Sequence, residues 1–345
     1  MPLCFIQIIV CPSQYSRSTK GRIGILEAIE SAFMQDHRIR SIRTAMNVTV
    51  ISGKGDKERS TVLKFAAGAT LKDLKKEYAR VSKKDVHRIS FKLEADKTKK
   101  LDSDSKTLES YGIVNDTVLR FKDLGPQIGY RTVFLIEYFG PMAFVLLYAL
   151  RPAFIYGKGA ASAEFNTVAA LGVVCWVAHF LKRELETIFV HKFSRPTMPL
   201  QNLFKNCAYY WIFGAVIGHP LCSPSFVAPA DRQVHIGLAI FIACELGNLI
   251  CHLMLSNMRP KEGSTARSIP TGFLFDYVAC PNYTFEVLSW VGFSIMTGLK
   301  FSYLFTLVGF LQMADWAQKK HKGYKKTYDK EYTSLKRKAI IPFVY

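Results

Sequence analysis

The chain has 345 residues, of which 49% are hydrophobic and 13% aromatic, and a formal net charge of +19 at pH 7. Such a length could form two soluble domains, and such a charge could indicate nucleic-acid binding. The basic residues lie largely between apolar runs, however, as they do in the cytosolic loops of membrane proteins, so we expect no nucleic-acid partner. The eight cysteines show no CxxC spacing, and we predict neither a metal site nor a disulfide framework.

Composition divides the chain into three parts. Residues 1–45 match no domain pattern and are treated as an extension of unknown role. Residues 46–123 carry charges every few positions and are predicted to form a soluble α+β domain. In residues 124–345, apolar runs of about 20 residues recur, which is the length needed to cross a ~30 Å hydrocarbon core. We therefore predict a soluble domain followed by an α-helical polytopic membrane bundle.

The pattern within the soluble domain has the order ββαββ. Two runs rich in β-forming residues, 47–52 and 60–65, flank a polar turn, which is typical of a hairpin. Thr70 can cap a following helix. Alternating apolar residues at 89–93 and 119–121 indicate two further strands. This order predicts a ubiquitin-like β-grasp domain, and the alternative is a generic α+β domain.

Six transmembrane spans are predicted in the third part of the chain. They cover residues 132–150, 164–181, 207–219, 234–256, 284–299 and 301–317. The connections 182–206 and 257–283 and the tail 319–338 are rich in Lys and Arg, whereas the other connections carry few positive charges. Because loops rich in positive charge stay in the cytosol, this alternation predicts a multi-pass protein with both termini cytosolic.

Polar side chains lie inside the predicted spans, where lipid makes them costly. They are Glu137, His179, Glu245, Asn248, His252 and Glu286. No GxGxxG motif follows a predicted strand, and the sequence contains no P-loop, HExxH or GxSxG motif. So many polar residues within one bundle predict an internal cavity, where the chemistry would take place.

Several separated motifs carry a resemblance to a known family. Gly247-Asn248, Ile269-Pro270-Thr271-Gly272 and Cys280-Pro281-Asn282-Tyr283 resemble the cofactor-binding region of the steroid 5α-reductase family. The ubiquitin-like front and four further segments resemble its very-long-chain trans-2-enoyl-CoA reductase branch. These segments are Glu184–Phe193, Thr197–Pro199, Asn206–Trp211 and Ile341–Phe343. The resemblance covers residues 46–345.

The resemblance implies the last reaction of each fatty-acid elongation round. A very-long-chain trans-2-enoyl-CoA becomes a saturated acyl-CoA, and NADPH is the cofactor that provides the hydride. The resemblance also implies a location in the endoplasmic reticulum membrane. The expected partners are the long-chain enoyl-CoA substrate, membrane lipid and other enzymes of the elongation cycle, which the soluble domain could dock.

Three residues are candidates for catalysis. The family's proposed acid is the tyrosine of the Pro-Asn-Tyr motif, here Tyr283, and a phenol keeps its proton at neutral pH and can donate it to an enolate. Lys192 is a possible electrostatic partner for an oxyanion or a phosphate, or else a basic flank of a span. Glu137 approximately matches a substrate-side glutamate of steroid reductases, or else is paired inside the bundle.

The resemblance also implies a set of cofactor-binding residues. They are Asn248, Arg259, Arg267, Asn282, Glu286, Trp290 and Tyr324. Arg259 could pair with a phosphate through two parallel hydrogen bonds, and the charge of Arg267 suits the 2'-phosphate of NADPH. Only the location carries over for His252, because steroid reductases have an acidic residue there.

Two alternatives remain open from the sequence. One keeps the cofactor site but changes the substrate to a steroid or a polyprenal. The other is a non-catalytic membrane adaptor with a ubiquitin-like head, in which Tyr283 would be an ordinary aromatic residue of the membrane boundary.

Overall fold

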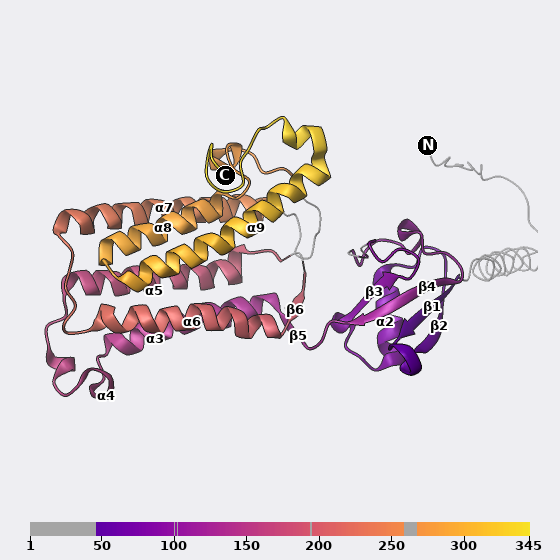
Figure 1. Cartoon of the computed structure of the whole chain (residues 1–345), viewed down its shortest axis with the longest axis horizontal. Coiled ribbons are helices and arrows are strands. Elements are labelled where there is room, and N and C mark those ends of the chain that lie inside the picture. The colour runs from indigo at the N-terminus through magenta and orange to yellow at the C-terminus, as the bar shows by residue number, and fades with distance from the viewer. Residues whose placement is uncertain (1–45, 100, 102, 194, 259–267) are drawn as a thin grey trace, which may run out of the picture. The chain divides into compact units, whose positions relative to one another are not determined.

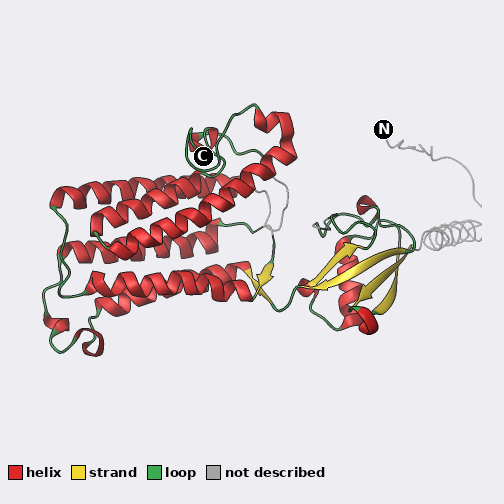
Figure 2. Ribbon diagram, in the orientation of Figure 1, coloured by secondary structure: helices red, strands yellow, loops and turns green. Residues whose placement is uncertain are grey.

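The computed structural model describes residues 46–345 with the exception of 100, 102, 194 and 259–267. It divides after Asp123 into two compact units (Figure 1). The extension predicted for residues 1–45 lies outside the described residues. Helices dominate the chain, as predicted, and strands are concentrated in the first unit (Figure 2).

The first unit contains a four-stranded mixed sheet and one α-helix. Its strands are β1 (Met46–Ser52), β2 (Arg59–Phe65), β3 (Ile89–Leu93) and β4 (Thr117–Asp123), and its helix is α2 (Leu71–Ser82). The strand order is β2-β1-β4-β3, with β1 and β4 parallel and the other two pairs antiparallel. Three 3-10 turns connect these elements, η1 (Gly55–Lys57), η2 (Val86–Arg88) and η3 (Glu109–Tyr111).

Local sequence explains these elements. The Thr70 side chain accepts a hydrogen bond from the Asp73 backbone, and the Asp73 carboxylate accepts one from the Thr70 backbone at 2.9 Å, so a capping box begins α2. The predicted hairpin and helix cap are therefore confirmed. The buried face of α2 joins the inward side chains of the sheet in one apolar core, where the Tyr78 and Phe91 rings meet edge to face at 5.5 Å.

The second unit is a bundle of long helices. They are α3 (Tyr130–Ala149), α5 (Thr167–Leu185), α6 (Gln201–Cys222), α7 (Asp231–Asn257), α8 (Pro281–Thr297) and α9 (Lys300–Thr333). Shorter elements are β5 (Gln127–Gly129), α4 (Ala153–Tyr156), η4 (Ala160–Ser162), the π-helical turn η5 (Glu186–Val190), β6 (Thr197–Pro199) and η6 (Phe273–Asp276). Strands β5 and β6 pair antiparallel, and α9 is kinked at Asp329.

Each of the six predicted spans lies largely within one of these long helices. Among the described residues, two helices are long and apolar enough to cross a membrane by length and composition, α3 with a mean hydropathy of 1.6 and α7 with 2.0. Helix α8 has 17 residues, and α9 passes from an apolar half into a Lys-rich half, so its average is low. The structure therefore supports two spans on these criteria and shows helices at the other four positions.

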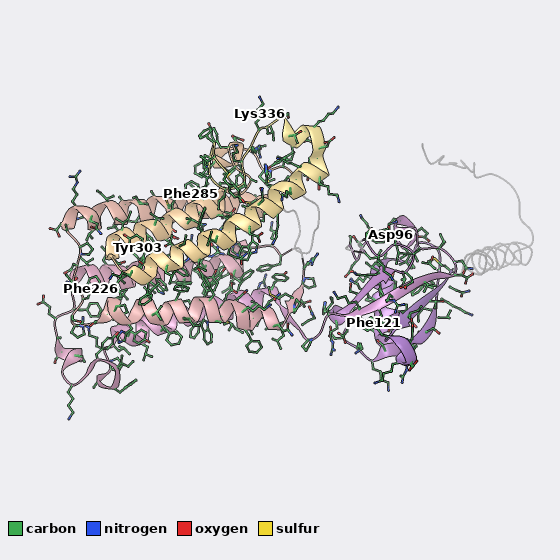
Figure 3. The ribbon with its side chains drawn as sticks, in the orientation of Figure 1. Asp96, Phe121, Phe226, Phe285, Tyr303 and Lys336 are labelled. Carbon is green, nitrogen blue, oxygen red and sulfur yellow. The ribbon has the colours of Figure 1, made fainter. Side chains whose placement is uncertain are left out.

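Glycines allow close approach of α7 and α8, which lie side by side in Figure 1. A Cβ atom added at Gly292 would lie 2.6 Å from the Phe241 backbone nitrogen, and one at Gly237 would lie 2.6 Å from the Gly292 carbonyl oxygen. Further along the same contact, Gly247 of α7 packs against the ring of Phe285 of α8, which is labelled in Figure 3. Small residues at such contacts are typical of helices that pack within a membrane.

Replacing Gly292 by Ala is expected to lower the Tm of the full chain in detergent. The new methyl group would overlap backbone atoms that cannot move aside, and overpacking of this kind costs about 1–3 kcal/mol. Gly323→Ala in α9 is the matched control, because a Cβ atom there meets nothing within 4 Å. An unchanged Tm for Gly292→Ala would contradict the close contact.

Candidate active site

A network of polar side chains lies between α5, α7 and α8. The Glu245 carboxylate contacts His179 Nδ1 at 2.8 Å and Lys182 Nζ at 2.8 Å. Lys182 also donates to Asn248 Oδ1 at 2.7 Å. The predicted spans therefore do hold costly polar groups, and these groups pair with one another across helices that are far apart in sequence.

A second part of the network surrounds Glu186, which opens the π-helical turn after α5. Its carboxylate lies 2.6 Å from Arg183 Nη1 and 2.9 Å from His252 Nδ1. Arg183 also donates to the Tyr138 hydroxyl at 3.0 Å. Both Glu186 and His252 are buried. An ion pair placed this deep must be hydrogen-bonded on several sides to offset its loss of water.

The ligand atoms of Glu186, His191 and His252 lie within 4.8 Å of one another, a spacing that could suit a metal ion. Arg183, however, donates to the carboxylate of Glu186 and lies 3.2 Å from His252 Nδ1. The Arg183 guanidinium therefore provides the positive charge that a metal ion would otherwise bring to Glu186. The cluster is an ion pair of Arg183 and Glu186 with two neighbouring imidazoles.

Helix α8 is attached to this network through its first turns. Asn248 Nδ2 donates to the Asn282 carbonyl oxygen at 2.9 Å and to Glu286 Oε2 at 3.0 Å. The other oxygen of Glu286 accepts from the Trp290 indole at 3.2 Å and lies 3.3 Å from His179 Nε2. These contacts fix the rotation of α8 about its axis, and hence the direction in which residue 283 points.

The C-terminal segment holds the start of α8 from the other side. The backbone nitrogens of Ala279 and Cys280 donate to the carbonyls of Lys338 and Ala339 at 2.8 and 3.1 Å. The Thr284 hydroxyl donates to the Ile340 carbonyl at 2.5 Å. Pro281 begins the helix, where its missing N–H costs nothing. The Ile341–Phe343 motif therefore follows directly on a segment that pairs with the approach to Tyr283.

A cavity of about 460 Å³ opens at this end of the bundle. Its wall contains four cations, Arg183, Lys192, Arg195 and Lys320. Aromatic rings and polar groups of the wall include Tyr130, Phe134, Phe193, Asn282, Tyr283 and Tyr324. No Asp or Glu of the described residues lines it. A site with this charge and this many rings is suited to a phosphorylated ligand with planar groups.

Tyr283 is half-buried and faces a cation that the sequence did not single out. Lys320 Nζ, on α9, lies 4.7 Å from the centre of the Tyr283 ring. Lys320 belongs to a run of basic residues after a predicted span, and such runs ordinarily mark a cytosolic flank. Arg183 and Arg195 were missed for the same reason, because positive charge beside a span has an ordinary explanation.

The structure brings some of the predicted site residues together and separates others. Tyr283, Lys192, Asn282 and Tyr324 line the cavity. Asn248, Glu286 and Trp290 lie behind its wall, in the network that holds α8. Arg259 and Arg267 lie outside the described residues.

Glu137 is placed apart from the cavity wall. It is buried in α3 and its carboxylate accepts a hydrogen bond from Asn206 Nδ2, on α6, at 2.8 Å. Asn206, the first residue of the Asn206–Trp211 segment, therefore serves as the hydrogen-bond partner of Glu137. The geometry favours the paired interior residue that the sequence left open as an alternative, and a substrate contact for Glu137 stays a prediction.

Comparisons with known proteins agree with the resemblance. The family described as 3-oxo-5-alpha-steroid 4-dehydrogenase matches residues 196–345. A relative from Trypanosoma brucei brucei, named "Putative enoyl-CoA reductase", is 46% identical over 307 residues, which are 87% of this chain and 100% of that protein. The very-long-chain enoyl-CoA reductase of Dictyostelium discoideum is 40% identical over 87% of this chain and 99% of its own length. A human protein named trans-2,3-enoyl-CoA reductase-like is 37% identical over 69% of this chain and 67% of its own length.

His191, beyond the end of α5, generates a prediction about stability and pH. Burial, together with the positive charges of Arg183 and His252, lowers the pKa of His191 to about 3 from its ordinary value of 6.5. The unfolded chain therefore takes up a proton below about pH 6.5 that the folded chain does not. The free energy of unfolding should decrease as the pH falls, by about 1.4 kcal/mol per pH unit below that value.

His191→Gln is expected to reduce this dependence, so that the Tm of the variant falls less than that of the wild type between pH 7 and pH 5. His87→Gln, at an exposed position of the first unit, is the control and should leave the slope unchanged. Parallel slopes for His191→Gln and the wild type would show that His191 is accessible to protons in the folded state.

Proposed function

Since this chain belongs to the family of very-long-chain enoyl-CoA reductases, we propose that it reduces trans-2-enoyl-CoA with NADPH at the 460 Å³ cavity. Reduction of an enoyl-CoA in fatty-acid elongation, an oxidoreductase reaction on a CH–CH group, is the activity of the family. The observation that carries the assignment to this cavity is the convergence of Tyr283, Asn282 and Lys192 on one wall, from segments that are about ninety residues apart in sequence.

The fit of the cavity to NADPH rests on charge and shape. Its volume lies within the range of about 300–1,000 Å³ that is usual for ligand pockets. Arg195 can pair with phosphate oxygens, and Lys192 adds a compact positive charge, whereas Arg183 is already paired with Glu186. Tyr324 offers a ring for a flat base. Bound NADPH would supply the hydride for the β carbon of the substrate.

The residues of this chain would then manage the proton and the developing charge. When the β carbon gains a hydride, negative charge builds on the thioester oxygen and a proton must reach the α carbon. Tyr283 would donate that proton. Lys320, whose ammonium lies 4.7 Å from the Tyr283 ring centre, would stabilise the phenolate that remains. Lys192 would stabilise the oxyanion or a phosphate.

The polar network behind the wall would act by positioning. Asn248 and Glu286 hold the first turns of α8, and the family resemblance assigns the same residues to the cofactor pocket. Asn248 and Glu286 can both hold α8 and bind the cofactor if the bound cofactor replaces one partner in these hydrogen bonds. Glu137 would contact substrate only if an acyl chain reaches between α3 and α6.

The second unit would be a six-helix membrane domain and the first a ubiquitin-like β-grasp domain. The exposed apolar side chains of α3, α7 and α9, including Phe139, Leu246 and Leu311, support contact with lipid. We place the protein in the endoplasmic reticulum membrane with both termini in the cytosol, where basic connections belong. The β-grasp domain would dock other elongation enzymes, which exchange poorly soluble acyl chains.

Two other functions compete with this one. A steroid or polyprenal reductase would share the cofactor site, and a comparison of substrates side by side decides between them. A non-catalytic adaptor would have no use for a cationic cavity beside Tyr283, so substitutions there should leave it unaffected.

Replacing Tyr283 by Phe tests the assignment directly. We expect kcat for a long trans-2-enoyl-CoA to fall by about 100-fold or more, because general acid catalysis contributes that much. NADPH binding, followed by its fluorescence, should be retained. Tyr303→Phe, on a half-exposed face of α9, is the matched control and should keep wild-type turnover. Full activity of Tyr283→Phe would remove this residue from the mechanism.

The proposed orientation can be tested in intact microsomes. Protease added from outside should digest epitope tags placed at either end of the chain, because both ends are expected on the cytosolic face. Protection of one tag until detergent is added would require an odd number of spans.

A further inference from the structure

A second cavity, of about 340 Å³, lies between the end of α9 and the C-terminal segment. Its wall includes His321, Lys325, Tyr332, Lys336, Arg337 and Lys338. No Asp or Glu of the described part of the chain lines it. Lys325, Lys336 and Lys338 are exposed, and Lys336 is labelled in Figure 3 just beyond the end of α9. The cavity is therefore a concave surface with several positive charges and no acidic side chain.

Arg337 is the buried element of this site. Its side chain is 2% exposed, and Nη1 donates to the Pro270 carbonyl oxygen at 2.5 Å. Nη2 lies 3.8 Å from the carboxylate of Asp276, which is largely exposed and also accepts from the Gly272 backbone. Nε has no hydrogen-bond partner among the described residues. A buried guanidinium with an unused donor costs free energy unless an acceptor arrives.

The floor of the cavity is rigid. His321 is buried and its Nδ1 lies 2.9 Å from the Tyr332 hydroxyl. Burial, with the nearby charges of Lys325 and Lys338, lowers the pKa of His321. The imidazole is therefore neutral at pH 7, and the positive charge of the wall comes from the lysines and Arg337.

The two cavities are neighbours along α9. Lys320 and Tyr324 line the first, whereas the adjacent residues His321 and Lys325 line the second. Pro270 lines the first cavity and accepts the hydrogen bond from Arg337, which lines the second. A molecule bound in the second cavity would thus lie beside the one that contains Tyr283.

We propose that the second cavity is a phosphate-binding subsite for the phosphorylated adenosine of the CoA thioester. The inference rests on the proposed function, which brings two phosphorylated nucleotides to one catalytic tyrosine. If the first cavity holds the reduced dinucleotide, the phosphates of the other reactant need cations of their own within reach. Lys325, Lys336 and Lys338 provide point charges for a phosphate, and the guanidinium of Arg337, which lines the cavity, adds a fixed positive charge.

The test uses the full chain in detergent and the double variant Lys325→Gln/Lys336→Gln, whose exposed positions spare the fold. We expect KM for a long trans-2-enoyl-CoA to rise about tenfold, since one or two charge-assisted contacts are lost. The KM values for NADPH and for the enoyl-pantetheine thioester, which lacks the phosphates, should be unchanged. Lys322→Gln/Lys326→Gln is the matched control, because these exposed lysines of α9 line neither cavity.

A binding experiment separates failure of this inference from failure of the proposed function. Calorimetry with adenosine 3',5'-bisphosphate, the phosphorylated end of CoA, should show binding that the Lys325/Lys336 variant weakens about tenfold. Adenosine 2',5'-bisphosphate, the corresponding fragment of NADPH, should bind both proteins equally. If the variant instead binds the 2',5' compound more weakly, the cavity belongs to the cofactor. If the variant binds both compounds as the wild type does, the proposed subsite is wrong, whether or not the protein turns over enoyl-CoA.

Discussion

The constraint on which the structure depends is that charges placed among apolar helices must be paired. Glu186 meets Arg183 at 2.6 Å and His252 at 2.9 Å, in a region where neither water nor lipid could replace those contacts. Glu245, His179 and Lys182 form a similar group nearby. Because each group joins α5 to α7, and Asn248 joins α7 to α8, the polar network selects one relative placement of the three helices. The close glycine contacts between α7 and α8 are compatible with that placement.

This placement determines where Tyr283, the proposed acid, lies. The start of α8 is held by Asn248 from within the bundle and by the C-terminal segment from outside. Tyr283 lies in the first turn of α8, so these two independent sets of contacts direct its phenol into the 460 Å³ cavity. If the proposed proton donor lay on a loop, it would lack these contacts and could turn away from the cavity without breaking any buried hydrogen bond. The network and the terminal segment therefore bring the motifs near residues 248, 283 and 341 together at the start of α8.

Charge is distributed unequally between the interior and its mouth. Inside, the carboxylates of Glu186 and Glu245 are paired with Arg183 and Lys182, whereas the two cavities that α9 helps to line present cations without acidic side chains among the described residues. A positive mouth attracts phosphorylated reactants from solution and raises their local concentration. Pairing inside the bundle, in contrast, avoids the cost of an unpaired charge in a low-dielectric region. The overall charge of +19 is consistent with the proposed binding of anionic nucleotide carriers.

Patterns along the chain were sufficient for features that depend on neighbours in sequence. The Thr70 cap, the hairpin of β1 and β2, the positions of the long helices and the Asn282-Tyr283 motif are of this kind, and the enoyl-CoA reductase family was identified from such motifs.

Tertiary structure decided which cations reach the site. Lys320 and Arg195 resemble any basic residue beside a span, and only the packing of α9 against α8 brings Lys320 to the Tyr283 ring. In the same way, the packing of α3 against α5 brings the Tyr138 hydroxyl to Arg183. For Glu137 the sequence left two roles open, a substrate contact or a pair inside the bundle, and only the packing of α3 against α6 identifies Asn206 as its neighbour. The physical reason is that periodicity and capping act over a few residues, whereas the partner of a buried charge is chosen by the packing of helices separated by tens of residues in the chain.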